Sequence, residues 1–213
     1  MVAATSHALH PLGEEDSSKR RQILDGARKV FMDLGFDGAS MNEIARSAGV
    51  SKGTLYVYFA DKSRLFEAIL EAEALEKSRI AYNLDPRRDA ETTLREFGQA
   101  YIGSMCRPGG GSSIRTVMAI AERMPDVGRQ FYENVLAKTI NRLADYLQAH
   151  VGPDDLAIDD CQLAAAQFMQ MCQATLFLPF VFQAEPAPSM ERIARVVDSA
   201  TRLFLQTYRA KPV

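Results

Sequence analysis

The chain contains no tryptophan, three cysteines and three histidines among its 213 residues, and this scarcity limits the chemistry available to it. Cys106, Cys161 and Cys172 are an odd number at wide spacing, which predicts reduced, buried thiols rather than a disulfide framework. The histidines form no recognisable ligand spacing with other residues. We therefore expect neither a metal ion nor a cofactor.

Patterns typical of catalytic sites are also missing. The chain has no G-x-S-x-G, C-x-x-C or H-E-x-x-H motif, and the glycines at 109–111 follow no predicted strand and lack a lysine partner. Paired acids at 154–155 and 159–160 fall in a loop and at a helix cap, where solvated charge is the ordinary explanation. The sequence does not predict an enzyme.

Long apolar runs are absent. The most apolar segment, residues 163–182, is interrupted by three glutamines and a proline, which makes it a poor membrane span. The N-terminus lacks the basic and apolar regions of a secretory signal. We expect a cytoplasmic protein without membrane contact.

Apolar residues recur at helical spacing along most of the chain, and no strand-like alternation is long enough to count. The predicted fold is all-α. We expect a disordered leader at 1–17, a three-helix head at 18–66 and a larger helical body at 67–213. An uninterrupted helix over 61–84 would connect head and body.

Net charge is −2 overall but unevenly distributed. Residues 17–66 carry nine Lys or Arg against five Asp or Glu, whereas residues 67–213 carry sixteen against nineteen. A basic head on a slightly acidic body favours nucleic acid as the partner of the head.

Two short helices in the head have strong end signals. Ser40 and Glu43 have the spacing of a capping box, and Gly49 is suited to the left-handed residue that ends a helix. Ser51 repeats the N-cap signal two residues later. This spacing predicts a helix–turn–helix with helices over 41–48 and 52–59.

The second of these helices has one apolar face and one unusual outer face. Leu55 and Phe59 point to a core, and the opposite face combines a glycine, hydroxyl groups and a small apolar side chain, which suits base edges. An ordinary three-helix packing unit with partly buried tyrosines is the alternative. The predicted DNA-binding residues are Ser40, Ser51, Lys52, Gly53, Thr54, Tyr56, Val57, Tyr58 and Lys62.

The segment GVSKGTLYVYFADKSRLF resembles the recognition-helix signature of the TetR family of bacterial repressors, and AERMPDVGRQFYENV resembles a segment of its AcrR-like branch. Every position of the G-V-S-x-x-T/S-L-Y-x-Y/H-F-x-x-K-x-x-L pattern is filled here. The resemblance implies a homodimer on a palindromic operator, with a four-helix bundle formed by the last two long helices of each chain.

Two further sets of residues are predicted in the body. Surplus apolar faces at 159–182 and 189–208 predict a dimer interface containing Leu163, Phe177, Ile193, Val197, Ala200 and Phe204. An adaptable effector pocket could be lined by Tyr101, Met105, Met118, Met124, Phe131, Phe168, Met169 and Cys172. Each of these pocket residues could equally belong to the core.

The expected function is a transcriptional repressor released from double-stranded DNA by a small, mostly apolar effector. A DNA-binding regulator without a small-molecule effector, controlled by a protein partner or by abundance, remains the alternative.

Overall fold

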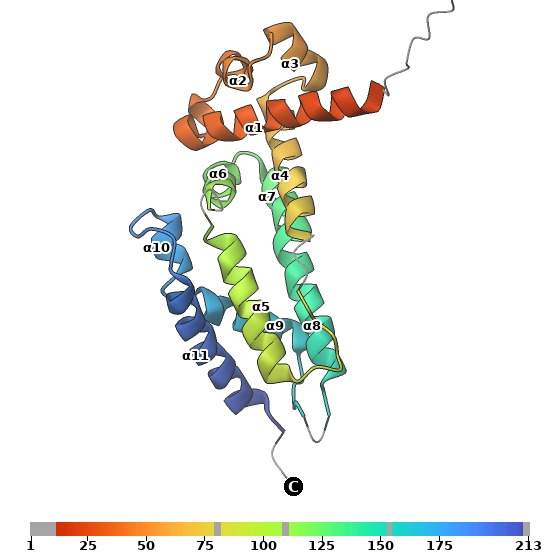
Figure 1. Ribbon diagram of the computed structural model, residues 1–213, viewed down its shortest axis with the longest axis vertical. Helices are drawn as coiled ribbons and strands as arrows, with labels where there is room; N and C mark the ends of the chain where they lie inside the picture. Colours follow the sequence, from red (N-terminus) through yellow and green to blue (C-terminus); the bar gives the residue numbers. More distant parts are fainter. Residues whose placement is uncertain (1–11, 79–81, 108–110, 153–154, 211–213) are drawn as a thin grey trace, which may run out of the picture. The chain divides into compact units, whose positions relative to one another are not determined.

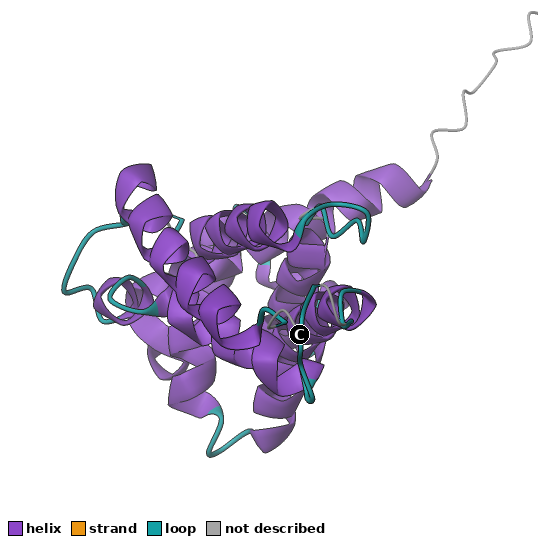
Figure 2. Cartoon of the chain, turned by 90° about the horizontal axis from the view of Figure 1, so that it is seen from below, coloured by secondary structure: helices purple, strands orange, loops and turns teal. Residues whose placement is uncertain are grey.

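The computed structural model describes residues 12–78, 82–107, 111–152 and 155–210. Its elements are α1 (Leu12–Gly38), α2 (Met41–Ala48), α3 (Lys52–Tyr58), α4 (Lys62–Ser78), α5 (Ala90–Met105), α6 (Ser112–Ile120), α7 (Pro125–Phe131), the π-helical turn η1 (Tyr132–Ala137), α8 (Lys138–Ala149), α9 (Cys161–Gln173), α10 (Phe177–Val181) and α11 (Met190–Tyr208) (Figure 1). In these ranges, extended pairing is limited to isolated bridges of Leu156 with Val151 and Arg209, and Figure 2 shows no strand. The fold is all-α, as predicted.

The chain divides into two compact units between Ile69 and Leu70. The first unit, which we call the head, contains α1 to α3 and the first turns of α4. The second unit, the body, contains the remaining residues. Among the described helices, none combines the length and the apolar character needed to cross a membrane.

The core of the head is built on an aromatic cluster. Phe31 and Phe36 of α1 stack at 5.6 Å between ring centres, and Phe66 of α4 meets them edge-on at 5.4 and 5.7 Å. Such rings bury large apolar areas and favour this geometry. Leu55 of α3, which is fully buried, and Phe59 after it complete the core from the helix–turn–helix.

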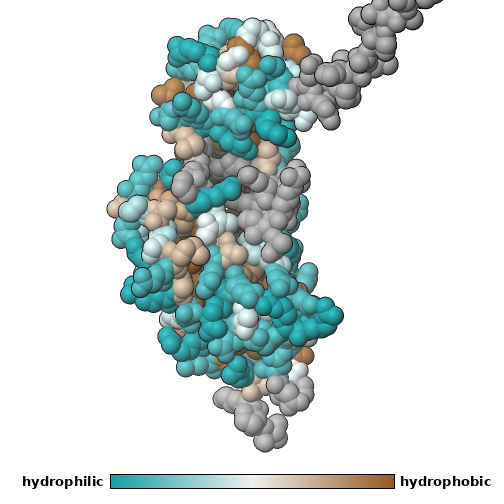
Figure 3. Space-filling view, in the orientation of Figure 1, coloured by the Kyte–Doolittle hydropathy of each residue, from teal (hydrophilic) through white to brown (hydrophobic). Residues whose placement is uncertain are grey.

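The body packs around α9. This helix contacts α5, α8 and α11, and α11 also contacts α5. Gly98 of α5 permits the α5–α11 contact, because a Cβ there would lie 2.7 Å from Val197 Cγ1. The described surface seen in Figure 3 is mainly hydrophilic, with smaller hydrophobic areas.

Several predicted boundaries are wrong. Residues 12–17 belong to α1, so this part of the predicted leader is helical, and residues 1–11 lie outside the described residues. The connector helix ends at Ser78 and residues 82–85 are not helical, while 79–81 lie outside the described residues. The apolar segment 159–182 is interrupted after α9, where Thr175 has a φ of 59°.

Met118, predicted to line the effector pocket, is exposed, and so is the apolar side chain of Leu34. Met118 is 66% exposed, because the buried stripe of α6 runs through Ile114, Val117 and Ile120, at a spacing that leaves Met118 outside it. Leu34 is likewise exposed, next to Gly35, where α1 loses its helical backbone at φ 70° and ψ 174°.

The predicted dimer-interface residues are largely internal to the protomer. Phe177, Ile193, Val197, Ala200 and Phe204 are all buried within one chain, and Phe204 packs edge-on against Phe168 at 5.4 Å. They cannot supply the surface of an interface in this fold. The apolar stripe of α11 packs instead against α5 and α9 of the same protomer.

Candidate nucleic-acid interface

The first helix of the helix–turn–helix, α2, is fixed at both ends. Ser40 Oγ accepts the Glu43 N–H at 3.2 Å, and Glu43 Oε2 accepts the Ser40 N–H at 3.0 Å, which completes the predicted capping box. The pKa of Glu43 is lowered mainly by the Ser40 hydroxyl, which donates to Oε2 at 2.7 Å, and also by the bond from the Ser40 N–H. At the other end Gly49 adopts φ 63° and ψ 35°, the left-handed conformation that costs glycine least.

The second helix, α3, begins directly after this turn. Ser51 Oγ accepts the Thr54 N–H at 3.0 Å, and the two hydroxyl oxygens lie 2.7 Å apart. After α3, Asp61 Oδ1 accepts the Arg64 N–H at 2.9 Å and caps α4. The predicted cap at Ser51 is confirmed, and together the caps at Ser51 and Asp61 set α3 between two short, defined turns.

The outer face of α3 is free to meet a partner. Val57 is 82% exposed, Tyr56, Lys52 and Gly53 are also exposed, and Leu55 on the opposite side is fully buried. An added Cβ at Gly53 would have only Ser51 Oγ nearby, at 3.8 Å. A short helix therefore presents a narrow, protruding face whose backbone can approach a groove closely.

Three groups flank this face. The Lys52 ammonium lies 5.9 Å from the centre of the Tyr56 ring, and the Arg20 guanidinium carbon lies 5.4 Å from that of Phe59. The Tyr58 hydroxyl is hydrogen-bonded to Asp16 of α1, and this bond is the main cause that raises the Tyr58 pKa. Sequence reasoning missed the Tyr58–Asp16 pair, because it assigned Asp16 to the leader.

The Lys62 ammonium has hydrogen-bond partners within the head. Its Nζ donates to the carbonyl oxygens of Phe36 at 2.8 Å and Ala39 at 3.2 Å. Lys62 as a DNA-binding residue stays a prediction. Ser40 is exposed but has its hydroxyl engaged with Glu43, at 2.7 Å from Oε2.

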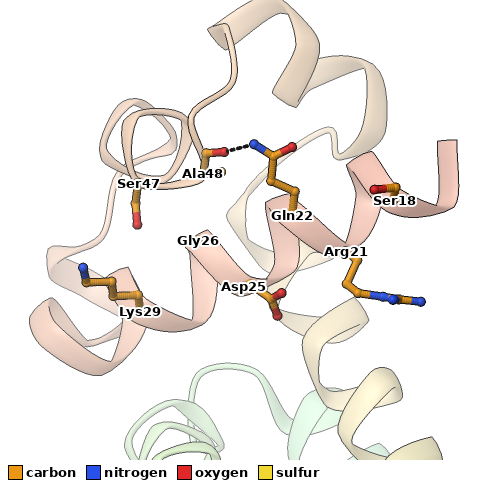
Figure 4. Close-up of a pocket in the computed structure, with 8 residues that line it drawn as sticks. All are labelled: Ser18, Arg21, Gln22, Asp25, Gly26, Lys29, Ser47 and Ala48. Atoms are coloured by element: carbon orange, nitrogen blue, oxygen red, sulfur yellow. Dashed lines mark hydrogen bonds between the residues drawn. The ribbon is translucent and has the colours of Figure 1, made fainter. Parts of the chain in front are cut away.

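A surface hollow of about 490 Å³ lies between α1 and α2 (Figure 4). Gln22 Nε2 donates to the Ala48 carbonyl oxygen at 2.6 Å across it, where α1 and α2 come together at Gly26. Arg21 and Lys29 add basic groups to its lining, and Asp25 adds an acidic one. None of the predicted DNA-binding residues lines this hollow.

Some of the residues predicted to line the effector pocket lie together in the body. Phe97 of α5 stacks on Tyr101 at 5.9 Å and contacts Phe168 at 6.4 Å, and Gln173 Nε2 donates to the Tyr101 hydroxyl at 2.9 Å. Burial raises the pKa of Tyr101 and raises that of Cys172 to about 12, so the thiol stays protonated. Met105, Phe131 and Met169 are buried, Met124 is half-buried, and exposed Met118 is removed from the set.

Sequence reasoning missed Gln173 in this cluster, although a glutamine inside an apolar segment was a usable signal. The three cysteines are free and buried, as predicted. Among residues that the structure describes, no three His, Cys, Asp or Glu side chains come together as a set that could hold a metal ion.

A capped helix pair with an exposed second helix defines a helix–turn–helix DNA-binding protein. Comparisons with known proteins specify the family. Residues 23–69 match the family model described as bacterial regulatory proteins, tetR family, and residues 92–210 match that of the AefR-like transcriptional repressor, C-terminal domain. The chain belongs to the TetR family of transcriptional regulators, which are not enzymes.

Relatives and solved structures agree with this assignment. The HTH-type transcriptional repressor Rv1474c of Mycobacterium tuberculosis is 28% identical over 149 residues, which is 67% of this chain and 74% of that protein. The repressor AcnR of Corynebacterium glutamicum is 31% identical over 68 residues, 32% of this chain and about a third of its own length (36%). The structure named Flavonoid-responsive Regulator FrrA has a TM-score of 0.76 and 28% identity, and the match covers 92% of this chain and all of that one (100%).

Proposed function

We propose that this regulator is a repressor that binds an inverted-repeat operator as a homodimer, placing α3 of each head in the major groove. The observation that carries the proposal is the exposed outer face of α3, held in place by buried Leu55 and Phe59. Gly53, Tyr56 and Val57 on that face would read base edges, while Ser51, Lys52, Thr54 and Tyr58 around it would meet bases or phosphates.

Footprinting with salt-dependent binding tests this proposal. A dimeric helix–turn–helix protein should protect two half-sites about 34–36 Å apart, or a multiple of that distance, and its affinity should fall steeply as salt rises. Tyr56→Ala should alter discrimination among sites, whereas Met32→Ala, at an exposed position of α1, should not. Asymmetric protection, or binding insensitive to salt, would contradict the proposal.

The dimer surface is proposed on the outward sides of α9 and α11 instead of on their buried stripes. Leu163 and Leu203 are 53% and 52% exposed there, on two long C-terminal helices of the kind that would pair in the four-helix bundle implied by the family resemblance. Sedimentation of Leu203→Asp at low micromolar concentration should show monomers that are fully helical by circular dichroism. Dimers under these conditions would place the interface elsewhere.

We further propose that a small, mostly apolar effector acts through the body. The ring cluster of Phe97, Tyr101 and Phe168 with the Tyr101–Gln173 hydrogen bond suits a planar aromatic molecule with a polar group, and a relative of similar fold is named as flavonoid-responsive. A hundredfold loss of operator affinity requires that the effector favour the non-binding state by about 2.7 kcal/mol.

A thermal-shift screen tests the effector separately from the operator. An effector that binds only the folded state raises the melting temperature, and by linkage its affinity must fall when operator is present. Phe168→Ala should reduce the shift. A ligand with equal affinity in both conditions would leave the alternative, regulation by a protein partner or by abundance.

A further inference from the structure

The helix α9 ends in a tight turn that leads directly into α10. Ala174 has φ −52° and ψ 131°, and Thr175 has a φ of 59°. The Leu176 N–H donates to the Gln173 carbonyl oxygen at 3.1 Å. This pattern is that of a type II β-turn, whose third residue is usually glycine because its φ is positive. A β-branched threonine at this position holds backbone strain.

The other end of α10 also has a left-handed residue that is not glycine. The Gln183 N–H donates to the Phe180 carbonyl oxygen at 3.1 Å, and the Ala184 N–H donates to that of Pro179 at 2.9 Å. These two bonds form a Schellman motif, in which glycine is the usual left-handed residue, yet Gln183 has this role at φ 59°. Two strained residues therefore enclose a five-residue helix in which two side chains are buried. Strain of this kind persists only where the surrounding structure holds it.

Two side chains hold the turn at Thr175 in place. Gln173 closes the turn with its backbone carbonyl, and its side-chain Nε2 donates to the Tyr101 hydroxyl of α5 at 2.9 Å. From α11, Arg192 Nη2 donates to the Thr175 carbonyl oxygen at 2.8 Å. One residue, Gln173, therefore connects the strained turn to the ring cluster of the proposed effector site.

The helix α10 is tied in turn to α6. Arg115 Nη1 of α6 donates to the Val181 carbonyl oxygen at 3.1 Å. The Phe180 ring lies against the residue before α6, since a Cβ added to Gly111 would be 3.1 Å from Phe180 Cε1. A shift of α10 would therefore be passed on to α6.

We propose that the Tyr101–Gln173 hydrogen bond is a latch that holds α10 in its strained conformation. A hydroxyl group of the effector opens the latch by donating to the Tyr101 oxygen in place of Gln173. Once released, Thr175 leaves the left-handed region, and α10 moves together with α6. Gln173 is thus a positioning residue, because its side chain senses the ring cluster while its carbonyl closes the turn. The inference rests on the proposed effector function and specifies how binding at that site changes the body.

Amide exchange in the protein without DNA or effector tests the latch. Tyr101→Phe removes the hydroxyl and keeps the ring, and the Leu176 N–H reports closure of the turn. We expect this N–H to exchange about fivefold to tenfold faster in the variant, as for the loss of one hydrogen bond. Tyr208→Phe is the matched control, because it removes a hydrogen bond of 3.0 Å to Gln167, a residue within α9 and away from the turn. It should leave Leu176 exchange unchanged.

Thr175→Gly tests whether strain drives the release. Glycine adopts a positive φ without steric cost, so the turn should stay closed even when the latch is removed. In the double variant of Tyr101→Phe with Thr175→Gly, the Leu176 N–H should exchange at the wild-type rate or more slowly. Gln173→Leu removes the same hydrogen bond from its other side, and it replaces Tyr101→Phe if that variant does not fold.

Operator binding shows whether the latch acts on function. Without any effector, Tyr101→Phe should bind operator about fivefold more weakly or worse, and Thr175→Gly in the same chain should restore the affinity. Unchanged Leu176 exchange or unchanged operator affinity in Tyr101→Phe would each overturn the proposal, and so would the absence of rescue by Thr175→Gly. A wild-type chain whose melting temperature no member of a panel of flavonoids and other planar phenols raises would instead refute the proposed effector, while amide exchange still decides the latch.

Discussion

Replacing Gly26 by alanine should destabilise the head and with it operator binding. Gly26 lies where α1 meets the last turn of α2, and a Cβ added there would be 2.6 Å from the N, Cα and Cβ atoms of Ala48. Carbon atoms in favourable contact are about 3.5–4.0 Å apart. Two of the three neighbours are backbone atoms, so the helices themselves would have to separate, and the Gln22–Ala48 hydrogen bond would stretch with them.

The magnitude follows from two opposing effects. Alanine in place of glycine favours a helix by about 1 kcal/mol, whereas overpacking costs about 1–3 kcal/mol. Because backbone must move, we take the upper end and expect a net loss of about 2 kcal/mol. For a unit of this size, such a loss lowers the melting temperature by about 8–16 °C.

Thermal unfolding followed by far-ultraviolet circular dichroism, together with operator binding, measures this effect. Gly103→Ala is the control, since no atom lies within 4 Å of its added Cβ in α5 and the helix should gain up to about 1 kcal/mol. A Gly26→Ala protein that melts at or above the wild-type temperature would refute the reasoning from close packing.

The other predictions concern α3, the body and one carboxylate. Gly53→Ala should leave the head at least as stable in a thermal melt but weaken operator binding; equal binding would show that the α3 backbone does not approach the groove closely. Phe204→Asp should lower the free energy of unfolding in urea by about 3 kcal/mol or more, because Phe204 is 1% exposed. Leu163→Asp should change only the sedimentation behaviour. The reverse pattern would assign Phe204 to the dimer interface. Arg87→Ala should raise the pKa of Asp85 from about 2 toward 3.8 in a carboxyl NMR titration, because the Arg87 guanidinium bonds both carboxylate oxygens. Since folding depresses this pKa, its stabilising contribution is present above pH 3.8 and is lost as the pH falls through about 2; an unchanged pKa in the variant would contradict this.

Local signals in the sequence predicted the helix–turn–helix well. The caps at Ser40 and Ser51 depend on side chains within three residues of their partners, and both are present. Gly49 also ends α2 as predicted. Such contacts are short in sequence, so the residues themselves determine them.

The partners against which helices and side chains pack in the tertiary structure were not predictable in the same way. The apolar stripe of α11 could face either its own protomer or a second chain, and periodicity alone does not distinguish these partners. The hydrogen bonds of Lys62 were not predicted, because their acceptors are backbone carbonyls of residues 36–39, which have no signature in the sequence. The apolar segment is interrupted at Thr175, a residue that gives no helix-breaking signal in the sequence.

The π-helical turn η1 has a consequence for how the chain tolerates changes in length. A π turn holds one residue more than the α-helical turn it replaces. The helices α7 and α8 on either side are therefore oriented as they would be in one continuous α-helix that is one residue shorter. Removing one residue from Tyr132–Ala137 should therefore restore regular α-helix and leave Phe131 and Leu143 on the same side. The same deletion within α8 would rotate everything beyond it by about 100° and turn Leu147 out of the core.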